Sequence, residues 1–361
     1  VLRNVGVDGG SVTGGTSVGG LVGYNDAGTI SNAFATARVS ATSSGGGLVG
    51  FTTGDVSDAY ATGSVTVSGT DAGGLTGGNR GTIRHTWASG KVTGTGSNVG
   101  GRVGLAMNGS VADSYWDSFS TGQGVAVGVV TSATVTNLNA VSSDPAQAAA
   151  ANYAFKQGTY ASLDFGSTWT AFDGTRPFLR SEWQTTVTNA HQLQLMSLKL
   201  GAAYVLGRNI DASETGRDDG TAAMSSGMWA QTGFMRVGTD GPRFVGSLDG
   251  QYHVISGFTI HRPTIDSWVG LFGKTGGAVV KNLGMANVSI VGSSAVGGSN
   301  SLGTYTSEGA AHPLLGVALD LAYALSPSFQ LEANLGNLRW APVNGGSLVV
   351  LGATLGASLR F

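Results

Sequence analysis

The sequence contains no cysteine. This absence excludes disulfide bonds, thiolate metal sites and cysteine nucleophiles. Charged residues make up only 11% of the 361 residues, against roughly 25% in an ordinary globular domain. The formal net charge is −2, without the clustered Lys and Arg that nucleic-acid binding requires. No apolar run reaches the roughly 18 residues of a membrane-spanning helix. The composition therefore predicts neither a nucleic-acid partner nor a helical membrane protein.

Glycine, in contrast, is present in excess, at 61 positions. A collagen triple helix is excluded because there is no Gly-X-Y period, and the apolar content of 41% is too high for a disordered linker. Since Gly supplies the positive φ values of tight turns, we expect many short strands joined by such turns. The chain opens on Val1 with no charged or apolar leader, so we expect either a removed signal peptide or a fragment.

An internal repeat is the strongest feature of the sequence. A block related to Gly-Gly-Leu-Val-Gly recurs at intervals of 27 residues, beginning at Gly19, Gly46, Gly73 and Gly100. Each interval holds about three short apolar runs separated by Gly, and no single repeat could bury a hydrophobic face alone. Stacked repeats can do so, because their Val, Leu and Ile side chains then form continuous columns. Gly at this density disfavours a helical repeat, since each one costs about 1 kcal/mol inside a helix.

An aromatic residue also recurs between these blocks, as Phe34, Tyr60 and Trp87. Two interpretations stay open at this point. The aromatic residues form either a binding stripe or a stacked ladder that caps the core, and the second interpretation is favoured.

The repeated blocks resemble the GLUG motif of filamentous-haemagglutinin-type adhesins and related secreted surface proteins. Ser114-Tyr115-Trp116-Asp117, followed by Thr121-Gly122-Gln123, resembles the segment that closes such arrays, and Asp164 to Leu179 resembles the connector that follows. The resemblance covers roughly residues 15 to 300 and implies a β-solenoid displayed at a cell surface. Arg102 departs from the motif, because the other blocks have Leu at this position.

Two short helices are predicted beyond the repeats. Asp144-Pro145 is a typical helix start, Ala146 to Lys156 is rich in helix-forming residues, and Gly158 would end the helix. A second short helix is expected over Asn189 to Leu200. The stretch from Asn209 to Phe258 resembles another segment of the same adhesins, which implies further β-helix coils.

The last fifty residues change character. From His312 onward, apolar residues alternate with small or polar ones over strands of about 11 to 16 residues, which is typical of membrane-spanning β-strands. Asn344-Gly345 indicates a hairpin, and Phe361 resembles the C-terminal signature of bacterial outer-membrane barrels. A soluble sandwich shows the same alternation and stays an alternative. Three strands cannot close a barrel, so we expect either several chains to share one or most of it to be missing.

Candidate chemical groups are few. The five histidines show no spacing typical of a zinc-binding helix; they are His85, His191, His253, His261 and His312. His253 and His261 could share a face with Asp249, although exposed loop histidines are the favoured interpretation. Asp218-Asp219 is the only adjacent acidic pair, and we interpret it as a solvated turn. The sequence therefore nominates no catalytic, cofactor-binding or metal-binding residue.

We therefore predict an all-β chain: a right-handed β-helix-like solenoid in two segments, followed by antiparallel membrane-type strands. The expected parts are a GLUG-type solenoid at 1–141, a connector with a short helix at 142–182, a second β-helix segment at 183–303 and outer-membrane-type strands at 304–361. The expected function is that of a non-catalytic bacterial surface adhesin with a host-cell, matrix or glycan ligand, an extracellular solenoid, no cofactor and no nucleic-acid partner. It would be anchored in the outer membrane through 304–361, as a homo-oligomer if chains share a barrel. The alternatives are a carbohydrate-active β-helix (a polysaccharide lyase or hydrolase) and a purely structural outer-membrane component.

Overall fold

The computed structural model describes residues 1–216, 226–263 and 268–292, and the course of five short strands between 323 and 359. The chain divides into two compact units. The first consists of Val1–Glu182 with Arg217–Gln231, and the second of Trp183–Gly216 with Thr232–Phe361. Each unit is described by itself below.

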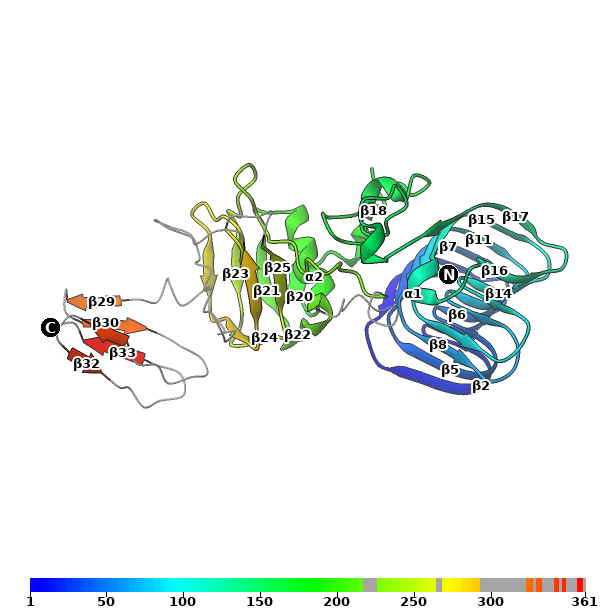
Figure 1. Ribbon diagram of the computed structural model, residues 1–361, viewed down its shortest axis with the longest axis horizontal. Coiled ribbons are helices and arrows are strands. Elements are labelled where there is room, and N and C mark those ends of the chain that lie inside the picture. Colours follow the sequence, from blue (N-terminus) through cyan, green and yellow to red (C-terminus); the bar gives the residue numbers. More distant parts are fainter. Residues whose placement is uncertain are drawn as a thin grey trace. The chain divides into compact units, whose positions relative to one another are not determined.

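The first unit is a β-solenoid built from three parallel sheets (Figure 1). The first and third sheets bury one apolar cluster, and the second sheet buries another. The first sheet contains β1 (Leu2–Val7), β4 (Thr29–Ala35), β7 (Asp55–Ala61), β11 (Thr82–Ala88), β15 (Ser110–Asp117) and β17 (Thr134–Val141). The second contains β2 (Ser11–Gly19), β5 (Arg38–Gly46), β8 (Val65–Val67), β9 (Ala72–Gly73), β12 (Val92–Gly94) and β13 (Val99–Gly100). The third contains β3 (Val22–Asn25), β6 (Val49–Thr52), β10 (Thr76–Asn79), β14 (Val103–Ala106) and β16 (Val127–Val130).

The four glycine-leucine blocks stack directly on one another. The backbone N–H of Leu21 donates to the carbonyl of Leu48 at 3.0 Å, Leu48 donates to Leu75 at 2.9 Å, and Leu75 donates to Arg102 at 2.8 Å. This confirms the β-solenoid predicted from the repeat, because residues one repeat apart become neighbours in adjacent coils. We call residues at equivalent positions of successive coils a column.

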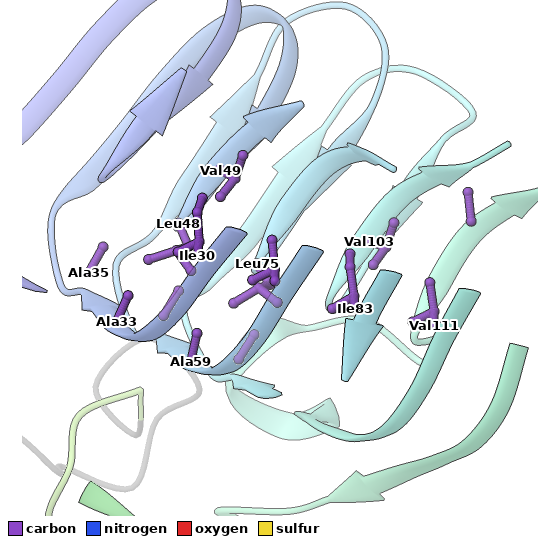
Figure 2. Close-up of a cluster of buried hydrophobic side chains, with 14 residues drawn as sticks. Ile30, Ala33, Ala35, Leu48, Val49, Ala59, Leu75, Ile83, Val103 and Val111 are labelled. Carbon is purple, nitrogen blue, oxygen red and sulfur yellow. The ribbon is translucent and has the colours of Figure 1, made fainter. Parts of the chain in front are cut away.

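The core lies inside the coils, where the apolar columns meet (Figure 2). Along β4, Ile30, Ala33 and Ala35 all belong to this core, although strict alternation would turn Ile30 and Ala33 to opposite faces. The left-handed backbone of Asn32, with φ 49°, inserts one extra residue, as a β-bulge does. The inside–outside pattern therefore changes phase in the middle of the strand.

The last glycine of each block packs against backbone of the preceding coil. A Cβ added to Gly50 would lie 2.3 Å from the carbonyl carbon of Ser17, and one added to Gly77 would lie 2.4 Å from that of Ser44. Since these neighbours are backbone atoms, they cannot rotate away. The motif thus requires Gly here for close approach between the second and third sheets.

We expect Gly50→Ala to lower the free energy of unfolding by about 2 kcal/mol or more, because coils must separate to admit the methyl group. Gly124→Ala is the control, since no atom lies within 4 Å of its added Cβ; it should be neutral or slightly stabilising. Chemical denaturation of both variants would measure this. Equal stability of the two variants would show that the close approach at Gly50 does not contribute to the stability of the solenoid.

Arg102 interrupts the leucine column with a fully buried cation. Its Nε donates to Thr86 Oγ1 at 3.0 Å, and its Nη2 donates to the same oxygen, while Nη1 has no hydrogen-bond partner among the described residues. Burial lowers the pKa of Arg102 to about 9. At neutral pH the guanidinium is still charged, so the last part of the array carries an uncompensated charge in its core.

Arg102→Leu should therefore raise the free energy of unfolding at pH 7 by roughly 2–4 kcal/mol. The pKa of Arg102 is lower in the folded chain than in the unfolded one, so its cost is fully present below pH 9 and falls as the pH rises through 9. The gain from Arg102→Leu should shrink accordingly between pH 8 and 10 in urea titrations. Exposed Arg84 provides the control Arg84→Leu. A loss of stability in Arg102→Leu would contradict the claim that buried Arg102 destabilises the array.

Asp117 closes the array and joins it to the connector. Its Oδ1 accepts hydrogen bonds from the backbone N–H of Phe119 and Ser120, which caps α1 (Ser118–Thr121), and from Ser143 N–H at 3.2 Å. Its Oδ2 forms an ion pair with Arg176. Both side chains are 0% exposed. Burial alone would lower the pKa of Arg176, but attraction to Asp117 and Tyr160, together with the hydrogen bonds to both, outweighs burial and raises that pKa.

The helix predicted over residues 146–156 does not form. Only a 3₁₀ turn is present, η1 (Pro145–Gln147), capped by Asp144 as the start signal indicates. Ala154 instead donates its N–H to the Ser142 carbonyl, and Phe155 is buried. Tertiary pairing thus overrides helix propensity here. The rest of the connector holds η2 (Gln157–Thr159), the antiparallel pair β18 (Trp169–Thr170) and β19 (Phe178–Leu179), and η3 (Arg180–Glu182).

Asp117→Asn should cost about 3–5 kcal/mol, because it leaves the Arg176 guanidinium buried without a counter-charge. Adding Arg176→Met to Asp117→Asn should recover part of this loss, which a double-mutant cycle by thermal or urea unfolding would measure. Asp164→Asn in the exposed part of the connector is the control, with an expected cost below about 1 kcal/mol. Strictly additive effects of Asp117→Asn and Arg176→Met would contradict the coupling.

The second unit is also a parallel β-solenoid, so the two units together have about ten turns. Its sheets contain β20 (Thr186–Val187), β21 (Ala203–Leu206), β23 (Ser247–Asp249) and β26 (Val279–Lys281); β22 (Ile210–Asp211), β24 (Val254–Ser256) and β27 (Gly284–Ala286); and β25 (Thr259–Arg262) and β28 (Ser289–Gly292). The predicted second helix is present as α2 (Ala190–Leu195), capped by Asn189, followed by η4 (Met196–Leu198). The turn η5 (Ser213–Gly216) completes the described elements.

Most of the predicted outer-membrane-type segment at 304–361 lies outside the described residues. Within it the structure gives β29 (Tyr323–Ser326), β30 (Phe329–Glu332), β31 (Ala341–Val343), β32 (Gly346–Leu348) and β33 (Gly356–Leu359). Their pairings are antiparallel. In the part of the chain that the structure describes, no helix is long and apolar enough to cross a membrane.

Candidate functional site

The aromatic column of the first sheet does stack, but it faces neither the core nor the solvent. The rings of Phe34 and Tyr60 are 5.2 Å apart at an interplanar angle of 10°, and those of Tyr60 and Trp87 are 4.5 Å apart at 3°. These side chains point away from the core, because the core residues of β4, Ala33 and Ala35, flank Phe34 along the strand.

The connector covers this aromatic column. Tyr60 donates a hydrogen bond to Glu182 at 2.9 Å, Trp169 packs against the Tyr60 ring, and the Arg176 guanidinium lies 5.8 Å from the Trp87 ring centre. Tyr60 is 0% exposed. The aromatic column is therefore the surface on which the connector docks, and it does not offer a stripe to a ligand.

The histidines do not converge on a site in the described residues. His85 lies 3.9 Å from Asp58 in the first sheet, and buried His191 lies 3.6 Å from Glu214 in the second unit. His253 contacts Asn209; Asp249, expected to share its face, binds Lys281 and Asn282 instead. His261 is exposed on β25. His312 and Asp218-Asp219 lie outside the described residues. Within the described ranges, no three His, Asp or Glu side chains form a group that could hold a metal ion.

The bulge positions of the first sheet form a polar column. All have left-handed backbone, with φ between 45° and 55°; they are Asn4, Asn32, Asp58, His85, Asp113 and Asn137. Their side chains largely bind one another: Asn32 donates to Asn4 at 3.2 Å, and Asn137 donates to Asp113 at 2.6 Å. Asp58 also accepts from Trp169 of the connector at 3.4 Å. This column supports the strand bends and the docked connector.

The second sheet, in contrast, presents an uncovered face made of hydroxyl groups. Its inward residues are apolar, as in the valine column Val12, Val39, Val65 and Val92. The outward residues between and beside them form two hydroxyl columns. One consists of Thr13, Ser40, Thr66 and Thr93, and the other of Thr42, Ser68 and Thr95, and all seven are exposed.

The geometry of these columns follows from the sheet. Adjacent strands place equivalent hydroxyls about 4.8 Å apart along the solenoid, and outward residues two positions apart lie about 6.6 Å from each other along a strand. In the described residues, the side chains of the first hydroxyl column make no hydrogen bond to other protein groups. Each hydroxyl can donate one hydrogen bond and accept two, so the first hydroxyl column is a regular array of free hydrogen-bonding groups. In the second column, the Thr95 hydroxyl donates to the backbone carbonyl of Ser68.

A third column borders the hydroxyls and carries positive charge. It consists of Ser11, Arg38, Ser64 and Lys91, joined by backbone bonds from Val39 N–H to Ser64 and from Val65 N–H to Lys91, both 2.8 Å. Arg38 and Lys91 are exposed. The strands of the second sheet contain no Asp or Glu. We call the two hydroxyl columns together with this cationic column the hydroxyl face.

The comparisons agree with the repeat. Residues 14–40 match the family of the GLUG motif. The matched segment runs from β2 through β3 and β4 into β5, so it corresponds to one full coil. No curated protein and no solved structure matches the chain.

The hydroxyl face was not singled out from the sequence. Its signal is present in the alternating runs that follow each aromatic block, such as Ser64-Val65-Thr66-Val67-Ser68. Those runs predict a strand, but alternation alone does not say which face the connector covers. Only the fold shows that the first sheet is covered by the connector and that the second is open.

Proposed function

We propose that this chain is a bacterial surface-displayed, adhesin-like repeat protein that binds its ligand without catalysis, through the hydroxyl face. The GLUG match and the β-solenoid support a surface repeat protein. The observation that carries the binding proposal is the exposure of seven Ser and Thr side chains in two columns, on a sheet whose outward face no described residue of the first unit covers. The proposed location is the cell surface, with the solenoid outside the outer membrane.

A regular hydroxyl array suits a host-cell, matrix or glycan ligand. Single hydrogen bonds between exposed groups contribute little, about 1 kcal/mol or less each. Repetition along a stiff scaffold lets one extended ligand make several such contacts without further loss of conformational freedom in the protein. A glycan presents hydroxyls of the same donor and acceptor chemistry along its length. We therefore assign the hydroxyl face as the binding surface.

An enzymatic role is the second candidate, favoured by one observation. Asp58 and Asp113 lie in the same outward column two coils apart, about 9.6 Å by strand spacing, close to the carboxylate separation of inverting glycosidases. However, Asp58 accepts from Trp169 and Asp113 accepts from Asn137, so both carboxylates have structural partners. We favour binding, and turnover of an acidic polysaccharide that Asp58→Asn abolishes would decide for the enzyme. A purely structural outer-membrane role predicts no ligand at all.

Binding of the full-length chain to immobilised host-cell and matrix glycans would test the adhesin proposal. Thr66→Val with Thr93→Val removes two hydroxyls and retains β-branched side chains that suit a strand. We expect this double variant to lose at least about tenfold in affinity. The control is Thr134→Val with Thr136→Val, two exposed threonines of β17 on the first sheet. Equal binding by both variants and the parent would overturn the assignment of the hydroxyl face.

A further inference from the structure

We infer, on the basis of the function proposed above, that the ligand of the hydroxyl face is an extended acidic polysaccharide that carries a carboxylate on every second sugar. It would lie along the solenoid axis, across the strands. Its carboxylates would meet Arg38 and Lys91, and its hydroxyls would meet the two hydroxyl columns.

The spacing of the two cations supports a period of two sugars. Arg38 pairs with Ser64, and Ser64 with Lys91, in consecutive coils. The two charges are therefore two strand spacings apart, about 9.6 Å. A sugar ring in an extended chain advances by about one strand spacing, so a polymer lying across the strands brings alternate sugars to Arg38 and Lys91. The sugar between them meets Ser64, which is neutral.

The charge distribution favours an anion on the hydroxyl face over one on the first sheet. Arg38 and Lys91 form no ion pair with a described residue, and the strands that carry the second sheet contain no acidic residue. The first sheet also has two exposed arginines, Arg3 and Arg84. There, the carboxylates of Asp58 and Asp113 lie in the neighbouring column, so positive and negative charge alternate and the net attraction for a polyanion is smaller.

The chemistry of the two cations fits carboxylates held beside hydroxyls. The planar guanidinium of Arg38 can bind both oxygens of a carboxylate, while the Lys91 ammonium acts as a compact point charge. The neighbouring residues two positions along each strand are Ser40 and Thr93, both of the first hydroxyl column. Each acidic sugar therefore meets one cation and at least one hydroxyl from the same strand.

Hyaluronan, which has a carboxylate on every second sugar, and its carboxyl-reduced form, which has the same backbone without charge, are the probes for the full-length chain. The variant is Arg38→Gln with Lys91→Gln. The control, Arg3→Gln with Arg84→Gln, removes the same charge from the first sheet. Biolayer interferometry at 50 and 150 mM NaCl would give the affinities.

We expect the parent to bind hyaluronan about tenfold more tightly than the carboxyl-reduced polymer at 50 mM NaCl. The Arg38→Gln, Lys91→Gln variant should lose this preference, and the control should keep it. The preference of the parent for hyaluronan should weaken at the higher salt concentration. Equal affinity of the parent for the two polymers, failure to bind either, or equal losses in variant and control would overturn the inference. The Thr66→Val, Thr93→Val variant should weaken binding to both polymers, so binding that depends on the threonines but not on charge would leave the adhesin proposal standing.

Discussion

Register between coils of nearly equal length is the constraint on which the first unit depends. Each strand satisfies its backbone N–H and C=O groups on the coils before and after it, so a coil of the wrong length would leave buried polar groups unpaired. Partners in the first sheet differ by 26 residues between Ile30 and Val56, by 27 between Val56 and Ile83, and by 28 between Ile83 and Val111. The variation is absorbed at corners, and strand pairing is kept.

Because the register is kept, each sequence position becomes a column with one chemical role. Inward columns are apolar and fill the core, and the last glycine of each block lets the second and third sheets approach. The aromatic column offers a continuous ring surface on which the connector docks, fixed by the buried pair of Asp117 and Arg176. Arg102 shows what a misfit costs, since the leucine column has no carboxylate or other acceptor for its third nitrogen.

The repeat, the strands and the stacking could be predicted from the sequence, because Gly spacing and apolar runs reflect local and nearest-neighbour constraints. The orientation of the aromatic column could not be predicted from the sequence. It depends on residues with left-handed backbone, such as Asp58 and His85, and these residues are of different types, so no sequence pattern marks them. The helix expected over residues 146–156 failed for a related reason: Phe155 and Ala154 are buried by partners distant in sequence. The hydroxyl face could not be predicted because tertiary contacts decide which sheet the connector covers, and the alternating pattern of a strand does not reveal them.

The open face is also where the fold makes the fewest demands on residue type. Outward positions of an uncovered parallel sheet need only tolerate a strand, and Val, Ile, Tyr or Thr would serve. Short hydroxyl side chains at seven such positions, on strands that carry no acidic residue, are therefore not required by packing, turns or strand pairing. A stiff solenoid also holds these groups at fixed intervals, so a polymer with a matching period gains several weak contacts at once. If the proposed polysaccharide is the ligand, its selection would follow from spacing and charge pattern and would not need an enclosed pocket.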